Sequence, residues 1–268
     1  MNLGIRAVVV ALALVCCGPA QAQILIARFD GTATLRMGDA PAAPVAKDRK
    51  EIPVGAQLRV GPGSTMVIGF PDGQVCVIGE NSVFRVNAYR FEQGQADKGF
   101  VDLNLVSGSL RIAFGEIGTV NPAAVRVQMG AATLGVANNA LAPTDASVVV
   151  LAGPMSVVVE AGRAVISLPA GQTQAVGAGQ GMVLAQDGTV RLGNAAQLAS
   201  LLGPGADAQE ILKQMASLEG MTETIQQTII TLASLLPTAD VLSAPALGTT
   251  ATAGTAGAGG GGKFASPN

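Results

Sequence analysis

The stretch GFPDGQVCVIGENS, residues 69–82, gathers residue types from which a catalytic site could be built. It contains Asp72, Cys76 and Glu80, followed by Asn81 and Ser82. A cysteine or serine becomes a strong nucleophile when a neighbouring base, usually histidine, removes its proton. The chain has no histidine, so histidine-activated nucleophiles and histidine-ligated zinc sites are excluded.

The same stretch has the pattern of a β-hairpin. Pro71 has the fixed φ that a tight turn uses, and Asp72 and Gly73 both tolerate turn geometry. In the strand that follows, Val75 and Val77 share one face, while Cys76 and Ile78 share the other. We therefore predict a hairpin in which Cys76 is a small buried apolar residue and not a reactive thiol.

Paired carboxylates are the remaining catalytic option, because two acids at a suitable separation can hydrolyse a glycosidic bond without histidine. The acids in question are scattered over different predicted strands and turns, and no pattern brings two of them together. We therefore expect no enzyme and name no catalytic residue, with a carboxylate-based periplasmic hydrolase as the less favoured alternative. These acids are Glu80, Glu92, Asp97, Asp102 and Glu116.

Three further motifs have a possible binding role. Asp102 and Asn104 share a strand face and could contribute oxygen ligands. Calcium takes six to eight oxygen ligands, so these two residues are a poor match for a calcium site. The glycines of GAGQG (177–181) open no helix, which a phosphate site requires. The charged run KDRKE (47–51) is either a docking surface or, as we expect, a solvated loop. The sequence thus predicts no metal site and no cofactor.

Residues 1–22 have the pattern of a secretory signal peptide. Arg6 precedes an apolar run over residues 7–17, and cleavage is expected after Ala22. No later segment is continuously apolar for the length of a membrane span, so we expect a soluble periplasmic or secreted protein. Cleavage removes one of the 16 basic residues and none of the 18 acidic ones, and such an acidic chain is not suited to nucleic acid.

Short β-branched runs separated by glycine, proline or Asx residues fill residues 23–192 and predict an all-β domain. The many tight connections imply an antiparallel meander, which is either a sandwich or a roll that coils on itself. The expected strands are 24–29, 32–36, 57–60, 65–70, 74–78, 83–91, 100–106, 109–114, 124–129, 132–136, 147–151, 155–160, 164–168, 173–176, 181–185 and 189–192.

The alternation of side chains predicts which strands have one buried face. The strands SLRIAF (109–114) and VDLNLV (101–106) alternate apolar with polar or small residues, so we expect both to be half-buried. The strands SVVVL (147–151) and MSVVVE (155–160) are apolar on both faces, which suits strands packed between two layers.

From residue 193 to 243 the period becomes helical. We expect helices at 194–202, 207–218 and 221–236, with an apolar stripe along the third. Their apolar faces either pack against the β domain and each other or form a surface for self-association. Residues 244–268 are rich in Ala, Gly and Thr, a composition that predicts a disordered tail.

Residues 31–181 resemble the FecR domain, named after an iron-citrate regulatory protein of Gram-negative bacteria. The segment IPVGAQLRVGPGSTMVIGFPDGQVCVIGENSVFRV (52–86) carries most of this resemblance, and LVSGSLRIAF (105–114) is similar to a later family strand. The pattern departs from the family at Met129-Gly130 and at Ala137–Ala140. Regulatory members of the family also have a cytoplasmic segment ahead of a membrane span, and we expect no such segment in this chain. The resemblance therefore implies the exported β domain without the signalling circuit.

Together these features predict an exported, non-enzymatic binding or scaffolding module of the cell envelope. We expect a protein partner there, or self-association through the C-terminal helices. The alternative from another class is a structural or extracellular-matrix protein whose β-rich body assembles with copies of itself.

Overall fold

A computed structural model describes residues 23–137, 148–153, 156–169, 171–185, 188–202 and 206–219, and positions 221, 223, 227, 228, 230 and 231. The predicted signal peptide, the predicted disordered tail, most of the third predicted helix and residues 138–140 lie outside these ranges. The chain divides into residues 1–236 and 237–268, and every described residue belongs to the first unit.

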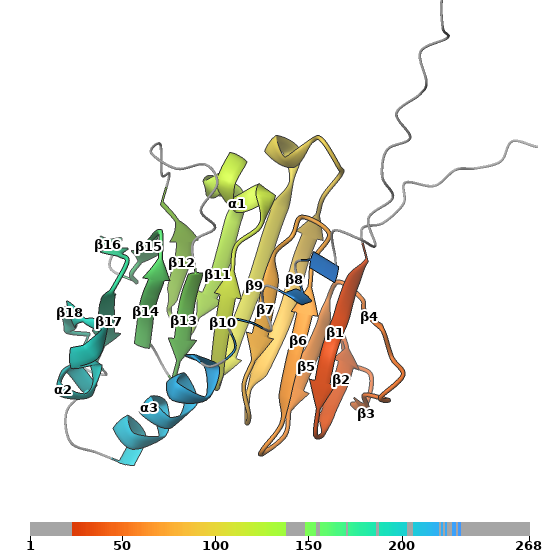
Figure 1. The fold of residues 1–268 in the computed structure, drawn as a ribbon, viewed down its shortest axis with the longest axis horizontal. Coiled ribbons are helices and arrows are strands. Elements are labelled where there is room, and N and C mark those ends of the chain that lie inside the picture. The colour runs from red at the N-terminus through yellow and green to blue at the C-terminus, as the bar shows by residue number, and fades with distance from the viewer. Residues whose placement is uncertain are drawn as a thin grey trace, which may run out of the picture. The chain divides into compact units, whose positions relative to one another are not determined.

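The described strands form two sheets of nine strands each, A and B (Figure 1). Sheet A has the order β18-β17-β14-β13-β10-β7-β6-β1-β4, and sheet B the order β16-β15-β12-β11-β9-β8-β5-β2-β3. The strands of sheet A are β1 (Ile24–Asp30), β4 (Glu51–Ile52), β6 (Thr65–Gly69), β7 (Val75–Ile78), β10 (Ser109–Ala113), β13 (Val148–Ala152), β14 (Ser156–Ala161), β17 (Gln180–Leu184) and β18 (Val190–Asn194). The strands of sheet B are β2 (Ala33–Met37), β3 (Ala43–Pro44), β5 (Ala56–Val60), β8 (Val83–Arg90), β9 (Phe100–Ser107), β11 (Val125–Met129), β12 (Ala132–Val136), β15 (Arg163–Ser167) and β16 (Thr173–Gly177).

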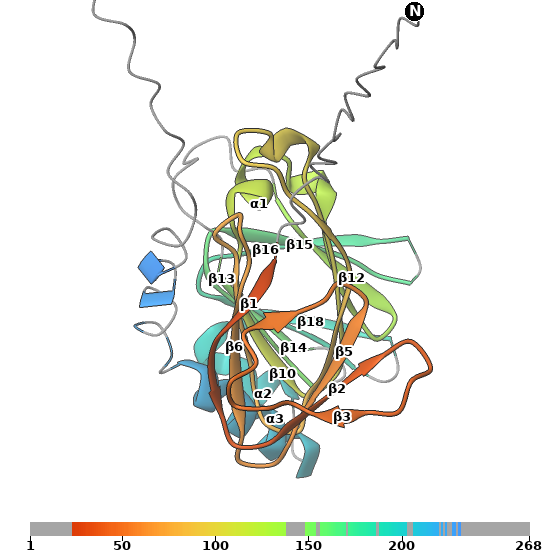
Figure 2. The same cartoon turned by 90° about the vertical axis from the view of Figure 1, so that its right-hand side faces the viewer.

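The chain alternates between the two sheets as it advances along them. One or two strands enter sheet A, and the next one or two enter sheet B. From β5 onward each new strand extends its sheet in the same direction, whereas β3 and β4 pair on the other side of β2 and β1. Figure 2 looks along the row of strands and shows the two facing layers. Every pairing between described strands is antiparallel except that of β9 with β11, which is parallel. The all-β prediction is confirmed, and the fold combines both expected forms: a sandwich through which the chain coils.

The main core lies between the sheets. It is built from the inward-facing residues of both sheets. Its largest fully buried side chains include Phe70, Phe84, Leu58, Leu103 and Leu110. In β9, Val101, Leu103 and Leu105 are buried while Asp102 and Asn104 are half-buried. The half-buried strand predicted for VDLNLV is therefore confirmed.

A second apolar cluster covers the outer face of sheet A. Val150 and Val158 belong to this cluster, whereas Val149 and Val159 belong to the main core. The strands SVVVL and MSVVVE are thus buried on both faces, as predicted. Helix residues complete the second cluster: Leu198, Ile211, Met215 and Leu218.

Strand β10 is also buried on both faces, so the half-buried strand predicted for SLRIAF is wrong. Arg111 lies on the outer face of sheet A and is only 3% exposed. Its Nη2 donates to Glu160 Oε2 at 2.5 Å. A buried guanidinium needs such a partner, and the sequence gives no sign that this face is covered.

Two of the predicted helices are present. The first corresponds to the 3₁₀ turn η3 (Ala195–Gln197) followed by α2 (Leu198–Leu202), and the second to α3 (Ala206–Glu219). An ion pair between Lys213 Nζ and Glu80 Oε1, 3.1 Å apart, joins α3 to the β7–β8 turn. Among the described residues, no helix has the length and apolarity needed to cross a membrane.

The sequence did not predict the shortest elements. These are β3, β4, the helix α1 (Glu116–Val120) and the 3₁₀ turns η1 (Ala96–Lys98) and η2 (Pro122–Ala124). Strands of two residues are too short to show alternation, and a five-residue helix is too short to show an apolar stripe.

The packing of α3 on sheet A gives a stability prediction. Leu218 is 1% exposed, so Leu218→Ala should lower the free energy of unfolding by about 2–5 kcal/mol through lost burial and a cavity. Val106→Ala is the matched control because Val106, on sheet B, is 57% exposed; it should change stability by less than about 0.5 kcal/mol. Urea unfolding checks both. Equal losses in the two variants would contradict the docking of α3.

Candidate functional site

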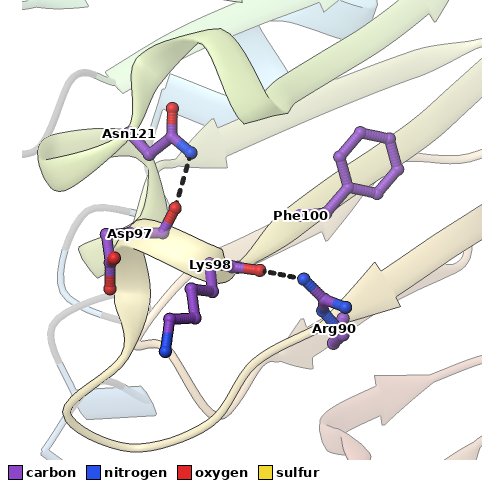
Figure 3. Close-up of a pocket in the computed structure, with 6 residues that line it drawn as sticks. Arg90, Asp97, Lys98, Phe100 and Asn121 are labelled. Atoms are coloured by element: carbon purple, nitrogen blue, oxygen red, sulfur yellow. Dashed lines mark hydrogen bonds between the residues drawn. The ribbon is translucent and has the colours of Figure 1, made fainter.

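A shallow pocket of about 550 Å³ lies where β8 ends and β9 begins. Arg90 is the last residue of β8 and pairs with Phe100, the first of β9. The connection between them, residues 91–99, contains η1 and contributes Asp97 and Lys98 to the pocket (Figure 3). Gly99 and Asn121 complete the lining.

Hydrogen bonds to the main chain hold this connection in place. Arg90 Nη2 donates to the carbonyl oxygen of Lys98 at 2.6 Å, and Asn121 Nδ2 donates to that of Asp97 at 2.8 Å. Gly99 lies against Ile117 of α1 so closely that a Cβ would come within 2.6 Å of Cγ1. Any larger residue here would push the connection away from α1, so Gly99 is needed for the shape of the pocket.

The pocket presents two cations, one carboxylate, an amide and a half-buried ring. Arg90 keeps further N–H donors beyond the one used for Lys98, because a guanidinium has five. The Lys98 ammonium contacts Gln95 Oε1 at 2.6 Å. Such groups form ion pairs and hydrogen bonds with a carboxylate ligand. The contacts described here suit recognition of a ligand better than proton transfer to one.

A second polar cluster lies at the tip of the β6–β7 hairpin. Asp72 is 5% exposed, and its Oδ1 accepts hydrogen bonds from the Tyr89 hydroxyl at 3.1 Å and the Gln74 N–H at 3.3 Å. The Tyr89 oxygen in turn accepts from the N–H of Asp72 at 3.2 Å. The Asp72 carbonyl accepts from the N–H of Glu116 at 2.8 Å, which joins the hairpin tip to α1.

Burial controls the protonation of this cluster. It raises the pKa of the Asp72 carboxyl from 3.8 to about 6, although the hydrogen bonds from Gln74 and Tyr89 oppose the shift. Burial and the nearby Asp72 carboxylate also raise the pKa of Tyr89. Among the described residues, Asp72 Oδ2 and both polar atoms of the Gln74 amide have no hydrogen-bond partner. A buried charge without full compensation is costly, which explains the direction of the Asp72 shift.

The hairpin predicted at residues 69–82 is confirmed. Gly73 takes the left-handed φ of +82° in its turn. Val75 and Val77 face the helix-covered cluster, while Cys76 and Ile78 face the main core. Cys76 is 0% exposed, and burial raises the pKa of its thiol, so its predicted burial is also confirmed.

The Glu-Asn-Ser segment that ends this stretch has structural contacts. Glu80 Oε2 accepts from the N–H of Gly63 at 2.7 Å, and this bond, with help from Lys213, lowers the pKa of the Glu80 carboxyl. Ser82 Oγ accepts from the N–H of Ser109 at 2.9 Å. These contacts tie neighbouring turns together.

The five acids considered as catalytic candidates have different surroundings. Glu80 contacts Gly63 and Lys213, and Asp102 Oδ1 accepts from Asn87 Nδ2 at 3.0 Å. Asp97 lines the pocket, while Glu92 and Glu116 are exposed. No described contact joins two of these carboxylates. Within the described ranges no group of three or more Cys, Asp or Glu side chains is placed to hold a metal ion.

The remaining motifs form turns. GAGQG makes the β16–β17 turn, in which Gln180 Oε1 accepts from the N–H of Gly177 at 2.7 Å. KDRKE connects β3 to β4 and is exposed, with Arg49 Nε donating to the Glu51 carbonyl at 2.9 Å.

Most of the pocket was not predicted from the sequence. Asp97 was considered only as one of five scattered acids, and Arg90, Lys98, Phe100 and Asn121 were not singled out. A usable signal was present in the polar connection at 92–99 between two predicted strands, because binding residues are concentrated on loops. The contact of Asn121 with this loop spans several elements and has no local sequence signature.

No protein-family model and no curated protein matches the chain. A crystal structure of a proposed anti-sigma factor from Parabacteroides distasonis is similar over 60% of this chain and 74% of that one, with 16% identity and a TM-score of 0.43. This distant likeness carries no function or residue role to the present chain. The FecR resemblance of residues 52–86 therefore stays a prediction from the sequence.

The raised pKa of Asp72 makes stability depend on pH. The folded state holds this proton more tightly than the unfolded chain, so the contribution of Asp72 is complete below about pH 4 and is lost as pH rises through about 6. At about 1.4 kcal/mol per pKa unit, the loss is about 3 kcal/mol. Asp72→Asn should remove this part of the slope.

The check is urea unfolding of both proteins from pH 4 to pH 7.5. The exposed Asp39 provides the control Asp39→Asn, which removes one negative charge elsewhere. If Asp72→Asn keeps the wild-type dependence on pH, the cluster does not hold the proton as described.

The burial of Cys76 predicts slow thiol labelling. In residues 23–268, where Cys76 is the sole cysteine, a disulfide reagent should label the thiol only after the protein unfolds in urea. Val106→Cys in a Cys76→Ala background is the positive control, because position 106 is 57% exposed and should label at once. Fast labelling of native Cys76 would show that the hairpin opens or is packed differently.

Proposed function

We propose that the protein is a non-enzymatic binding module of the cell envelope, and that its pocket binds a carboxylate-rich segment of a protein partner. The observation that carries this proposal is the pairing of two cations, Arg90 and Lys98, with a half-buried ring, Phe100, in one shallow depression. Cations supply ion pairs to acidic side chains, and the ring supplies apolar contact area.

The firm anchoring of the pocket loop, residues 91–99, favours a binding function. The loop is anchored to the core by Phe91 and Ala96, which are 9% and 3% exposed. Asn121 and Ile117 hold it from the side of α1. A loop fixed in this way loses little conformational entropy when a partner binds, so moderate contacts suffice for specific recognition.

Export and localisation rest on the sequence of residues 1–22, and the family assignment rests on the motifs in residues 52–86. We propose on this basis a periplasmic or secreted protein with a FecR-like β domain. The absence of enzymatic activity is part of the same proposal.

A partner should be sought with point variants and not by truncation. Removal of residues 194–268 would uncover Val67, Val77 and Val150, which α2 and α3 help to bury. An exposed apolar sheet face captures proteins nonspecifically, so a truncated chain would give misleading partners.

The test is capture from envelope extract of the native host on immobilised residues 23–268. Arg90→Gln/Lys98→Gln should weaken retention of the acidic partner about tenfold or more, since each charge-assisted hydrogen bond contributes about 1.5–3 kcal/mol. Lys47→Gln/Arg49→Gln, with the same charge change in the β3–β4 loop, should retain it.

Identical capture by the two double variants would contradict a role for the pocket. Robust turnover of peptidoglycan or glycans by the wild-type protein would overturn the non-enzymatic part of the proposal. Cell fractionation tests the localisation separately: recovery of full-length protein from the cytoplasm would contradict export.

A further inference from the structure

The two ends of the sandwich are built differently (Figure 1). At the end where the chain starts, the outermost strands are β3 and β4, each only two residues long. Pro44 lies in β3 and Pro53 follows β4 directly. Short strands and prolines prevent an edge from pairing with another chain, so this end is protected.

The loop around β3 also covers the core at this end. Val45 is 7% exposed, belongs to the main core, and donates its N–H to the carbonyl oxygen of Ala33 at 2.8 Å. The core is therefore closed on this side by residues of the chain itself.

In the described part of the chain, the opposite end has none of these protections. Its outermost strands are β16 and β18, each five residues long and free of proline. β18 pairs with β17 on one side, and no described strand lies on its other side. Arg191 is the one charged residue in these two strands, and its Nη1 donates to the carbonyl oxygen of Leu201 at 3.0 Å.

The centre of β18 exposes a large apolar side chain. Leu192 is 47% exposed. In the ladder it is the partner of Met182, which is fully buried in the main core. Paired residues project to the same face of a sheet, so Leu192 extends the row of core side chains to the end of the sandwich, where the described chain leaves it partly uncovered.

We propose that a second copy of this chain covers this end, with the two β18 strands pairing antiparallel about a two-fold axis at Leu192. A two-fold axis places each residue opposite its counterpart in reverse order. Leu192 of one copy then faces Leu192 of the other, and Arg191 faces Gly193. Two apolar side chains meet at the centre, and no like charges stand directly opposite each other.

The other end of a second copy is a poor partner for β18. A five-residue edge would meet strands of two residues, and Pro44 has no N–H to donate. Of the two longer edges, β16 exposes no large apolar side chain, so the complementary edge on another copy is β18 itself. Pairing of β18 brings the unprotected ends of the two copies together at the axis and leaves their β3–β4 ends outermost, so assembly stops at two copies and does not continue into a fibre.

The apolar residues of α3 are not available for self-association. Ile211, Met215 and Leu218 are 6%, 4% and 1% exposed because they pack on sheet A. Self-association at the β18 edge requires neither export nor a ligand in the pocket.

Analytical ultracentrifugation of residues 23–268 tests the dimer. The wild type should have twice the monomer mass at about 100 μM, a concentration at which a micromolar Kd gives mostly dimer. Leu192→Lys should be monomeric, because two like charges then meet at the axis. Val106→Lys, which places the same charge at an exposed position of β9, should stay dimeric.

A charge-swapped mixture separates loss of pairing from loss of folding. Leu192→Lys and Leu192→Glu should each be monomeric alone, and their equimolar mixture should form a dimer, because position 192 faces itself only across a two-fold axis. A monomeric wild type, a dimeric Leu192→Lys variant, oligomers that grow with concentration, or a mixture that stays monomeric would each overturn the proposal.

Discussion

Burial of the central strands of sheet A on both faces is the constraint on which the rest of the structure depends. Its strands β7, β13 and β14 carry apolar residues that alternate between the main core and the outer face, and the outer positions are valines: Val75, Val77, Val150 and Val158. Exposure of the outer valines to water would cost about 25 cal/mol for each Å² of apolar surface. The chain must therefore return across this face after β18, and α2 and α3 meet that requirement.

The same constraint explains the buried polar groups. Arg111 lies on the helix-covered face, is buried there and is paired with Glu160. The exposed Lys213 of α3 is paired with Glu80 in the β7–β8 turn. At the hairpin tip, Gly115 approaches Asp72 so closely that a Cβ would lie 2.4 Å from its carbonyl oxygen. The pocket loop is held by contacts of its own, in which Arg90 and Asn121 donate to main-chain carbonyl oxygens of the loop.

The sequence predicted regular elements well and long-range burial poorly. Alternation in VDLNLV identified its buried face, because each residue of a half-buried strand is sorted by polarity. In SLRIAF the same rule failed, since Arg111 is buried by a helix that follows much later in the chain. The turn at Asp72 was visible in Pro71 and Gly73, but its burial depends on Tyr89 and α1. The pocket likewise joins Arg90 to Asn121, and no local pattern records that contact.

Native-state hydrogen exchange tests the central claim most directly, namely that the central strands of sheet A are buried on both faces and those of sheet B on one. The account predicts that the amides of β10 and β13, between two apolar layers, exchange more slowly than those of β8 and β9, which are central in sheet B but solvated on one face. Exchange in β10 and β13 as fast as in β8 and β9 would contradict the account, because it would mean that the helices do not cover sheet A.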